Sequence, residues 1–243
     1  MSQKLLIRSH DRDSSSTGSH NFTVMLPDVI QEGTFKLRSC QIYNTAYTIT
    51  SGMNDKIYCS LGNKQVTPGY YSTGTAFATQ LQTDLITVNA GFTVTYSATT
   101  GKFTFANATP FIFQWANSIG DDAADQLGFQ VVNTASSTSL VSSCIPVLPQ
   151  SVSIMIQIGE AQSTDYYRTT NPKGDLLGVI RIPVDVGFGS IINHIPKTNY
   201  QQYINLRGTR RLTVRLYDEQ GRPYNLQNSD WTLELEKIGD LSC

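Results

Sequence analysis

The residues of this chain that could do chemistry are few and widely spaced. Its three histidines are His10, His20 and His194, and the first two flank a Ser-rich loop that also carries Asp11 and Asp13. Imidazole and carboxylate groups bind metals, but ten-residue spacing across a loop provides no preorganised geometry for one. We interpret this loop as an ion-paired turn between strands and predict no metal site.

Three carboxylates gather further along, at Asp121, Asp122 and Asp125. The segment lacks the ligand spacing and the glycine of a calcium-binding loop. Acidic side chains at the start of a helix offset the positive end of its dipole. The cluster therefore predicts the beginning of a short helix.

Nucleophilic groups form no recognisable motif either. The segment 187–190, Gly-Phe-Gly-Ser, resembles a nucleophile elbow, but no strand-to-helix context follows it and no histidine partner is identifiable. Cys40, Cys59, Cys144 and Cys243 lack the paired spacing of zinc ligands, and the first two fall inside strand-like runs, as buried thiols do. No phosphate loop or dinucleotide fingerprint appears. The sequence predicts no catalytic residue, no cofactor and no enzymatic activity.

Composition limits the partners. The 243 residues carry a formal net charge of −1, and only 15% are charged. This balance gives no field that would attract nucleic acid or an acidic membrane. No apolar run approaches the roughly 18 residues of a membrane span, and the first residues lack the features of a signal peptide. We expect a protein made and used in the cytosol, or in a particle assembled there.

Short runs of alternating apolar and polar residues open and close the chain, and such runs predict half-buried strands. A body that begins and ends on strands is expected to be closed or double-layered, because an unpaired terminal strand exposes a sticky edge. The strands are expected near residues 4–9, 20–26, 34–43, 54–61, 151–158, 176–184, 210–218 and 229–237. Eight antiparallel strands fit an all-β fold, a single jelly-roll sandwich of two sheets. The residues expected to face inward are Phe22, Val24, Leu37, Ile154, Ile156, Val214, Leu216, Leu233 and Leu235.

A small α+β insertion interrupts this pattern. Phe77, Leu81 and Leu85 recur every four residues on one helical face, with Thr73 or Thr75 as the cap. A β-hairpin follows at 92–105, and then a second, short helix that ends at Gly128. We predict a helix–hairpin–helix unit at 63–135, with the helix packed on the hairpin. Residues 1–62 and 136–243 would form the jelly-roll body.

Tyrosines are expected at strand ends and in connections, beside Asn, Gln and Ser. Such a composition is typical of contact surfaces, and also of the half-buried edges of any β protein. The tyrosines in question are Tyr43, Tyr47, Tyr70, Tyr71, Tyr166, Tyr167, Tyr200, Tyr203 and Tyr217.

Several segments together resemble one protein family. They are the opening Ile7-Arg8-Ser9-His10-Asp11-Arg12-Asp13-Ser14, the runs 22–27 and 37–47, Leu127-Gly128-Phe129, and the closing 212–221 before Trp231-Thr232-Leu233-Glu234-Leu235. In this order they resemble the penton, or minor capsid, proteins of virophages, Polinton-like viruses and related giant-virus relatives. The resemblance spans nearly the whole chain. Its specificity lies in the order and spacing of the segments.

The resemblance implies a single jelly roll that forms homopentamers at the fivefold vertices of an icosahedral virion assembled in the host cytoplasm. Its partners would be other copies of itself, a major capsid protein with a double jelly roll, and further minor capsid or fibre proteins. The family provides no catalytic residues to transfer to this chain. The alternative hypothesis is a jelly-roll module that binds carbohydrate, or a spike or receptor-binding domain, and an exposed aromatic platform on one sheet would favour it.

Overall fold

The chain folds into two compact units. The computed structural model describes residues 3–30, 32–146, 148, 152–162, 179–197, 199–219 and 221–238. One unit, which we call the body, consists of Met1–Ala46 with Ser151–Cys243, and the other, the inserted unit, is Tyr47–Gln150. Each has its own hydrophobic core.

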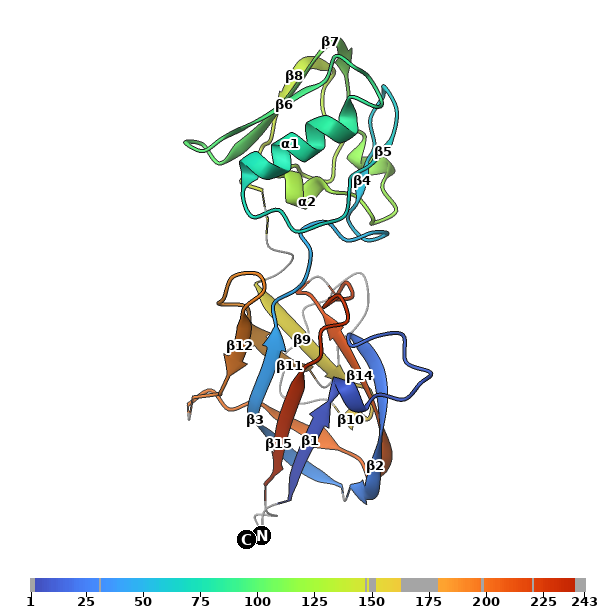
Figure 1. The fold of residues 1–243 in the computed structure, drawn as a ribbon, viewed down its shortest axis with the longest axis vertical. Helices are drawn as coiled ribbons and strands as arrows, with labels where there is room; N and C mark the ends of the chain where they lie inside the picture. The colour runs from blue at the N-terminus through green and yellow to red at the C-terminus, as the bar shows by residue number, and fades with distance from the viewer. Residues whose placement is uncertain are drawn as a thin grey trace. The chain divides into compact units, whose positions relative to one another are not determined.

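The body consists of two antiparallel sheets (Figure 1). The first, the six-stranded sheet, has the order β1-β15-β3-β13-β10, with β12 also paired to β3. The second, the four-stranded sheet, has the order β11-β9-β14-β2. The strands described in the body are β1 (Lys4–Arg8), β2 (Asn21–Ile30), β3 (Gly33–Tyr43), β9 (Ser153–Ile158), β10 (Ala161–Gln162), β11 (Val179–Pro183), β12 (Ile191–His194), β13 (Tyr203–Leu206), β14 (Thr209–Tyr217) and β15 (Thr232–Lys237). A 3-10 turn at Ser9–Asp11 follows β1.

The strand order is that of a jelly roll. Along the chain, β1, β3, β12–β13 and β15 enter the six-stranded sheet, and β2, β9, β11 and β14 enter the four-stranded one. The chain thus crosses between the sheets at almost every connection, as two Greek keys require. The predicted all-β fold with two antiparallel sheets is confirmed.

One of the eight predicted body strands differs from the structure. The strand predicted at 54–61 was wrong as part of the body, because only Lys56–Ile57 is a strand there and it pairs with Lys64–Gln65 of the inserted unit. Its place in the jelly roll is taken by β12 and β13, which pair end to end with the two halves of β3. The insertion therefore follows the third body strand and not the fourth.

The core of the body lies between the two sheets. Each of the nine residues predicted to face inward is buried. Strict alternation fails in β3 at a bulge opposite Glu234 and Leu235. Arg38 and Ser39 both avoid the core there, so Leu37 and Cys40 are buried although they are three residues apart. A bulge adds one residue to a strand and so shifts the alternation of inward and outward side chains by one position.

The first and last strands of the body pair with each other. β1 pairs with β15 from Lys4–Glu236 to Arg8–Thr232. Beyond the strands, the buried Trp231 donates its indole N–H to the Ser19 carbonyl at 2.7 Å and its backbone N–H to the Ser9 hydroxyl at 2.9 Å. Its ring also packs edge-on against Phe22. The last strand thereby fixes both the first strand and the loop after it.

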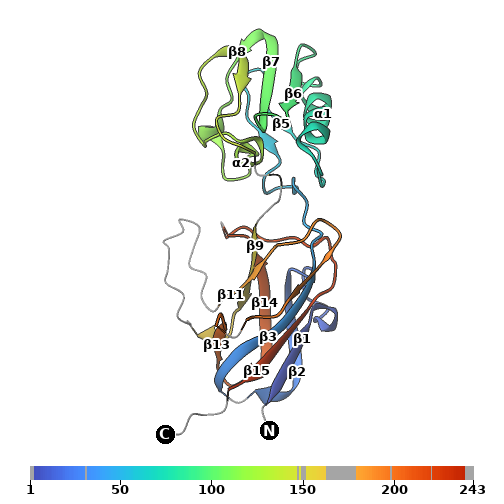
Figure 2. The ribbon, with the colours of Figure 1, turned by 90° about the vertical axis from the view of Figure 1, so that its left-hand side faces the viewer.

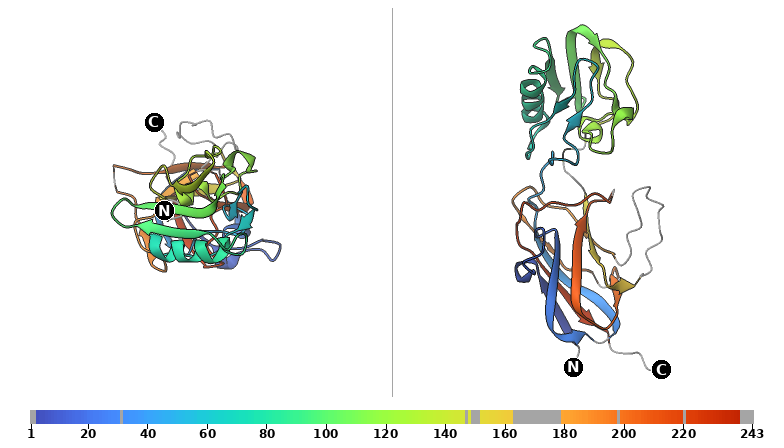
Figure 3. Two further views of the ribbon diagram at one scale, coloured as in Figure 1. Left: turned by 90° about the horizontal axis from the view of Figure 1, so that it is seen from above. Right: turned by 90° about the vertical axis from the view of Figure 1, so that its right-hand side faces the viewer.

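Both edges of the four-stranded sheet are covered. At β11, the Gln202 side chain donates to the Arg181 carbonyl and accepts from its N–H at 2.8 and 2.7 Å, as a neighbouring strand would. At β2, Asp13 donates its backbone N–H to the Thr23 carbonyl, and the Ser16 hydroxyl accepts from the Thr23 N–H. These contacts block the addition of a further strand. Figure 3 (right) shows β2 and β14 side by side, with the loop before β2 next to them.

The inserted unit packs one helix against a three-stranded sheet of order β6-β7-β8, and Figure 2 shows α1 beside β6. Its elements are β4 (Lys56–Ile57), β5 (Lys64–Gln65), α1 (Gly74–Leu85), β6 (Thr93–Ser97), β7 (Lys102–Phe111), a 3-10 turn at Trp115–Asn117, α2 (Ala124–Leu127) and β8 (Ser137–Val141). Phe77, Leu81 and Leu85 are buried, and the Phe77 ring meets Phe103 of the hairpin edge-on at 5.6 Å. The predicted packing of helix on hairpin is confirmed.

Local signals at the ends of both helices were read correctly. The Thr73 hydroxyl accepts from the Ala76 N–H at 3.1 Å and caps α1. Gly128 ends α2 with a φ of 74°, and a Cβ there would lie 2.3 Å from the Cys144 carbonyl oxygen. Glycine is thus required both by the left-handed backbone and by the close approach of a second segment.

The boundaries of the inserted unit differ from the predicted 63–135. Ile49, Ile57 and Cys59 belong to its core and not to that of the body. At the other end, β8 completes its sheet by pairing with β7. Alternating runs on either side of the insertion resemble body strands in sequence, and only their pairing assigns them to the smaller unit.

We predict unequal effects from truncating two leucines on paired strands. Leu235→Ala should destabilise the protein by about 2–5 kcal/mol, because the side chain is fully buried in the central strand β15. Leu6→Ala, on the neighbouring β1 but half exposed, should change stability by no more than about 0.5 kcal/mol. Urea unfolding followed by circular dichroism measures both. Equal losses would contradict the assignment of faces.

We also predict that the body folds without the inserted unit. A variant in which a short Gly-Ser linker replaces 47–150 should keep the β-sheet circular dichroism and dispersed amide NMR signals of the body, because the two cores share no residue. Loss of all β-sheet signal would show that the inserted unit completes the body core.

Candidate functional site

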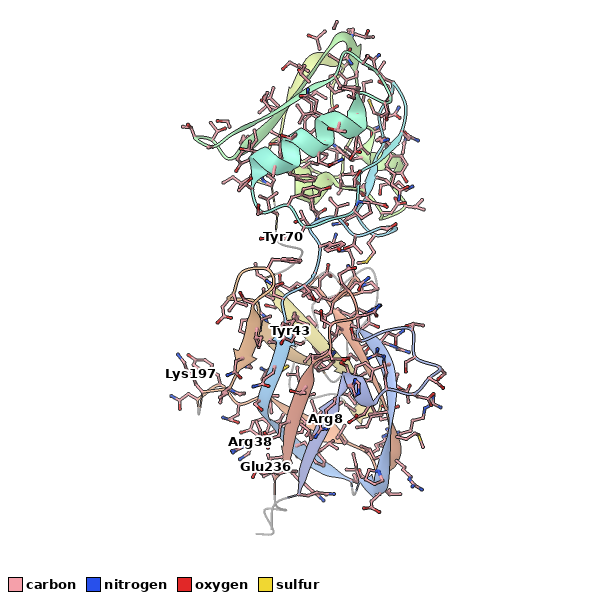
Figure 4. All side chains as sticks on the ribbon, in the orientation of Figure 1. Arg8, Arg38, Tyr43, Tyr70, Lys197 and Glu236 are labelled. Carbon is pink, nitrogen blue, oxygen red and sulfur yellow. The ribbon has the colours of Figure 1, made fainter. Side chains whose placement is uncertain are left out.

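The broadest exposed feature of the body is the solvent side of the six-stranded sheet, here called the outer face. It consists of the outward residues of β1, β15, β3, β12 and β13. Figure 4 shows Arg8, Arg38, Tyr43 and Glu236 on these strands. The residues of the outer face that matter below are Lys4, Leu6, Arg8, Lys36, Arg38, Gln41, Tyr43, Ile191, Asn193, Tyr203, Glu234 and Glu236.

Two carboxylates on the outer face pair with three of its basic side chains. Lys4 lies 3.4 Å from Glu234 across the β1–β15 pair. Glu236 lies 3.1 Å from Lys36 and 3.4 Å from Arg38, which the β3 bulge turns outward. Each exposed pair contributes about 0–1 kcal/mol to stability, so the main effect is to offset part of the positive charge of Lys4, Lys36 and Arg38.

Apolar side chains are exposed among these charges. Leu6 and Ile191 are about half exposed, and Tyr43 and Tyr203 nearly as much. Tyr43 and Ile191 are register partners on β3 and β12. Beside them lies a shallow groove of about 190 Å³, lined by Arg8, His10, Gln41, Tyr43, Ile191, Asp230, Trp231 and Thr232. The outer face thus offers a mixture of apolar, aromatic and paired charged groups.

Asp230 organises the end of this groove. Its carboxylate accepts from the Ser9 hydroxyl at 3.0 Å and from Arg12 at 2.8 Å, and lies 3.4 Å from His10 Nδ1. Partial burial opposes ionisation, but the hydrogen bonds from Ser9, Arg12 and His10 hold the pKa of Asp230 below its usual range. The predicted ion-paired turn exists, with Asp230 of the distant C-terminal segment as the acidic partner of Arg12.

The histidines predicted to form no metal site are not brought together. His20 is half-buried with an unpartnered Nδ1, and His194 lies on β12. Asp13 accepts the Ser15 N–H at 2.9 Å, and this hydrogen bond lowers the pKa of Asp13. Within the described ranges, no group of three His, Cys, Asp or Glu side chains could hold a metal ion.

The other chemical candidates have structural roles. Asp121 accepts from the Tyr58 hydroxyl at 2.8 Å, and Asp122 from the Ala124 N–H at the start of α2. The segment 187–190 is a tight turn that leads into the strand β12, not into a helix. Cys40 and Cys59 are buried, and burial raises the pKa of both thiols. Cys144 is exposed, and Cys243 lies outside the described residues.

The tyrosines divide between surface and interior. Tyr43, Tyr70, Tyr200 and Tyr203 are exposed. Tyr71 stacks on Phe77 at 4.6 Å, and burial raises its pKa to about 12. Tyr166 and Tyr167 lie outside the described residues. Of the tyrosines predicted to form a contact surface, only the exposed ones are therefore accessible to a partner.

Sequence reasoning missed Ile191 and Arg38 of the outer face, and it named Tyr203 without placing it on a strand. Ile191 and Tyr203 lie on β12 and β13, whose four-residue runs were not predicted as strands, although Tyr203-Ile204-Asn205-Leu206 alternates in polarity. Arg38 faces outward only because of the bulge. The run Leu37-Arg38-Ser39-Cys40, in which two polar residues separate two apolar ones, is the signal that could have revealed it.

Comparison with solved structures gives several matches, among them the following two. The chain is similar to the crystal structure of the mavirus penton protein, with 10% identity, a TM-score of 0.47, and coverage of 97% of this chain and 99% of that one. It is also similar to a chain in the cryo-EM structure of the Sputnik virophage, with 13% identity, a TM-score of 0.41, and coverage of 98% and 97%. The first is a penton protein, the class that the sequence resembles. No family model and no curated protein matches the chain. In the described part, no helix is long and apolar enough to span a membrane.

We predict that the body loses stability below about pH 6.5. Burial lowers the pKa of His20 and His194 below the ordinary 6.5, an effect that the Asp185 charge only partly offsets at His194. The unfolded chain then binds protons that the folded chain does not, so stability is full above pH 6.5 and falls as the pH drops. Urea midpoints at pH 7.5 and 5.5 should differ, and the double variant His20→Gln with His194→Gln should reduce the difference. An unchanged pH dependence in that variant would contradict the prediction.

Proposed function

We propose that this chain is a structural capsid protein without enzymatic activity, whose homopentamers close the fivefold vertices of an icosahedral shell against a double jelly-roll major capsid protein. The observation that carries the proposal is the jelly-roll order of the body strands. This architecture is shared by viral capsid proteins, lectins and cupins, so the fold alone leaves a choice among them. The sequence resemblance to penton proteins favours the first.

The outer face has the properties that contact between identical copies requires. Copies of one chain carry the same charges, so association favours surfaces whose charges are already balanced. Lys4 with Glu234, and Lys36 with Glu236, provide this balance over part of the face. Leu6 and Tyr43 add apolar and aromatic area, which is typical of the centre of protein interfaces.

The edge of the six-stranded sheet supports the same surface. β1 is the terminal strand of this sheet, and among the described residues no strand pairs with the edge beside its outward Lys4, Leu6 and Arg8. Such an edge can pair with another chain. The four-stranded sheet, by contrast, has Gln202 and Ser16 covering its edges. We therefore assign the contact with a neighbouring capsid chain to β1 and the outer face.

The two exposed tyrosines on the strands of the outer face, Tyr43 and Tyr203, give little support to the carbohydrate-binding alternative. A sugar platform needs neighbouring exposed rings. Tyr203 pairs with Lys36 of β3, and Tyr43 lies seven residues further along that strand. The two rings are therefore attached about 23 Å apart, at ~3.3 Å per residue, which is too far for one sugar.

The decisive test is a reconstruction of particles assembled from this chain and its major capsid protein. Density that fits the jelly roll, with the β1 edge against a neighbour, is expected around the fivefold axes. Density only at threefold or general positions would exclude the penton role.

A pair of variants tests the assigned surface. Leu6→Glu should lower vertex occupancy about tenfold or more, because it replaces an apolar contact by a carboxylate that must be desolvated and that lies opposite Glu234. Ile119→Glu makes the same change at an exposed residue of the inserted unit and should leave occupancy unchanged. Equal occupancy in the two variants would remove β1 from the interface.

A further inference from the structure

A second surface of the body has the features of a ligand site. It is a polar pocket of about 280 Å³ on the solvent side of the four-stranded sheet, between β2, β14 and the loop that precedes β2. The charged groups in its lining are both arginines. The lining residues are Ser15, Ser16, Thr17, Asn21, Phe22, Thr23, Arg211, Thr213 and Arg215.

The loop side of the pocket is held in place by its own hydrogen bonds. Asp13 donates its backbone N–H to the Thr23 carbonyl at 2.7 Å and accepts the Ser15 N–H on its carboxylate at 2.9 Å. The Ser16 Oγ accepts from the Thr23 N–H at 3.0 Å. Because this oxygen acts as an acceptor, its proton remains available to a ligand. The Thr17 hydroxyl already donates to the Asn21 carbonyl at 3.3 Å, so the loop presents the Ser16 hydroxyl as a donor from a fixed backbone.

The strand side supplies two cations. Arg211 and Arg215 are four residues apart on the same exposed side of β14, with Thr213 between them. Within the described part of the chain, neither guanidinium forms a hydrogen bond or ion pair, whereas Arg12, Arg181 and Arg222 each pair with a carboxylate. Two unpaired guanidinium groups that line one pocket are suited to a bound anion.

The two nearby carboxylates, those of Glu160 and Asp13, do not act as the anion bound by Arg211 and Arg215. Both Glu160 oxygens are engaged by Thr213, one by its backbone N–H at 2.7 Å and the other by its hydroxyl at 3.0 Å. Asp13 faces Ser15 and attracts Arg211 only through space. Both acids lie beside the pocket and are not part of its lining.

We propose that this pocket binds a tetrahedral oxyanion, the sulfate or phosphate group of a larger molecule. The guanidinium groups of Arg211 and Arg215 on one side and the Ser16 hydroxyl on the other can donate hydrogen bonds to oxyanion oxygens that point in different directions. The volume leaves room beside the oxyanion for part of the molecule that carries it, such as a sugar ring. The site is independent of the proposed assembly surface, because it lies on the other sheet.

The test is an NMR titration of the full-length protein at constant ionic strength, followed at the amides of Ser16 and Thr213. The probes are inorganic sulfate, inorganic phosphate, glucosamine 6-sulfate and glucose 6-phosphate. Saturable shifts with at least one probe are expected. A preference for the sulfated or the phosphorylated sugar identifies the source of the anion, and equal binding supports the shared chemistry. Shifts that never saturate with any probe would overturn the proposal.

Variants separate a built site from general charge attraction. Arg211→Gln and Arg215→Gln should each weaken binding about tenfold or more, the loss expected for one charge-assisted contact. Arg210→Gln is the matched control, because this neighbouring arginine donates to the Leu26 carbonyl and does not line the pocket. It should change binding less than about twofold. Equal weakening in all three variants would show that each one only lowers the general positive charge of the surface, and it would refute the site.

Discussion

The body depends on the pairing of the first strand with the last. β1 and β15 are separated by more than two hundred residues, yet they are neighbours in one sheet. Trp231 strengthens this closure, since its two N–H groups bind Ser19 and Ser9 on either side of the turn that follows β1. Bringing such distant segments together costs conformational entropy, because a long loop must close. This cost grows only slowly with loop length. A whole folded unit can therefore lie between β3 and β9 without preventing the pairing of the two ends.

The same closure divides the surface into two kinds. On the six-stranded sheet, β1 is the terminal strand in the described part of the chain, beside paired charges and exposed apolar side chains. On the four-stranded sheet, side chains and a loop cover both edges, and the loop that covers β2 also forms one wall of the arginine pocket. Thr23 thus takes part in both edge protection and pocket formation. The two proposed interactions, with a capsid neighbour and with an oxyanion, consequently occupy separate sheets.

The inserted unit differs from the body in its chemistry. Of the 18 Lys and Arg and 19 Asp and Glu residues of the chain, only eight lie within 47–150: Asp55, Lys56, Lys64, Asp84, Lys102, Asp121, Asp122 and Asp125. Several of these are engaged internally, as when Asp84 accepts from the Thr67 N–H and hydroxyl. Its core instead gathers buried phenylalanines with Trp115, stacked mostly edge to face. This dense aromatic packing explains how about a hundred residues with little regular structure can form a core of their own.

The sequence alone determined those features that depend on local periodicity and local capping. Alternation predicted the long strands and their inward residues, four-residue spacing predicted the helix that contains Phe77, and Thr73 and Gly128 marked helix ends. Tertiary structure decided what depends on the choice of partner. Residues 54–61 alternate like a body strand but pair within the inserted unit, and β12 and β13 are too short to be recognised without β3 beside them. Arg38 reached the outer face through a bulge, and Arg211 joined Ser16 through the folding of a distant loop. The physical reason is the same in each case: periodicity is a property of one segment, whereas pairing and pockets arise from segments that only the folded chain brings together.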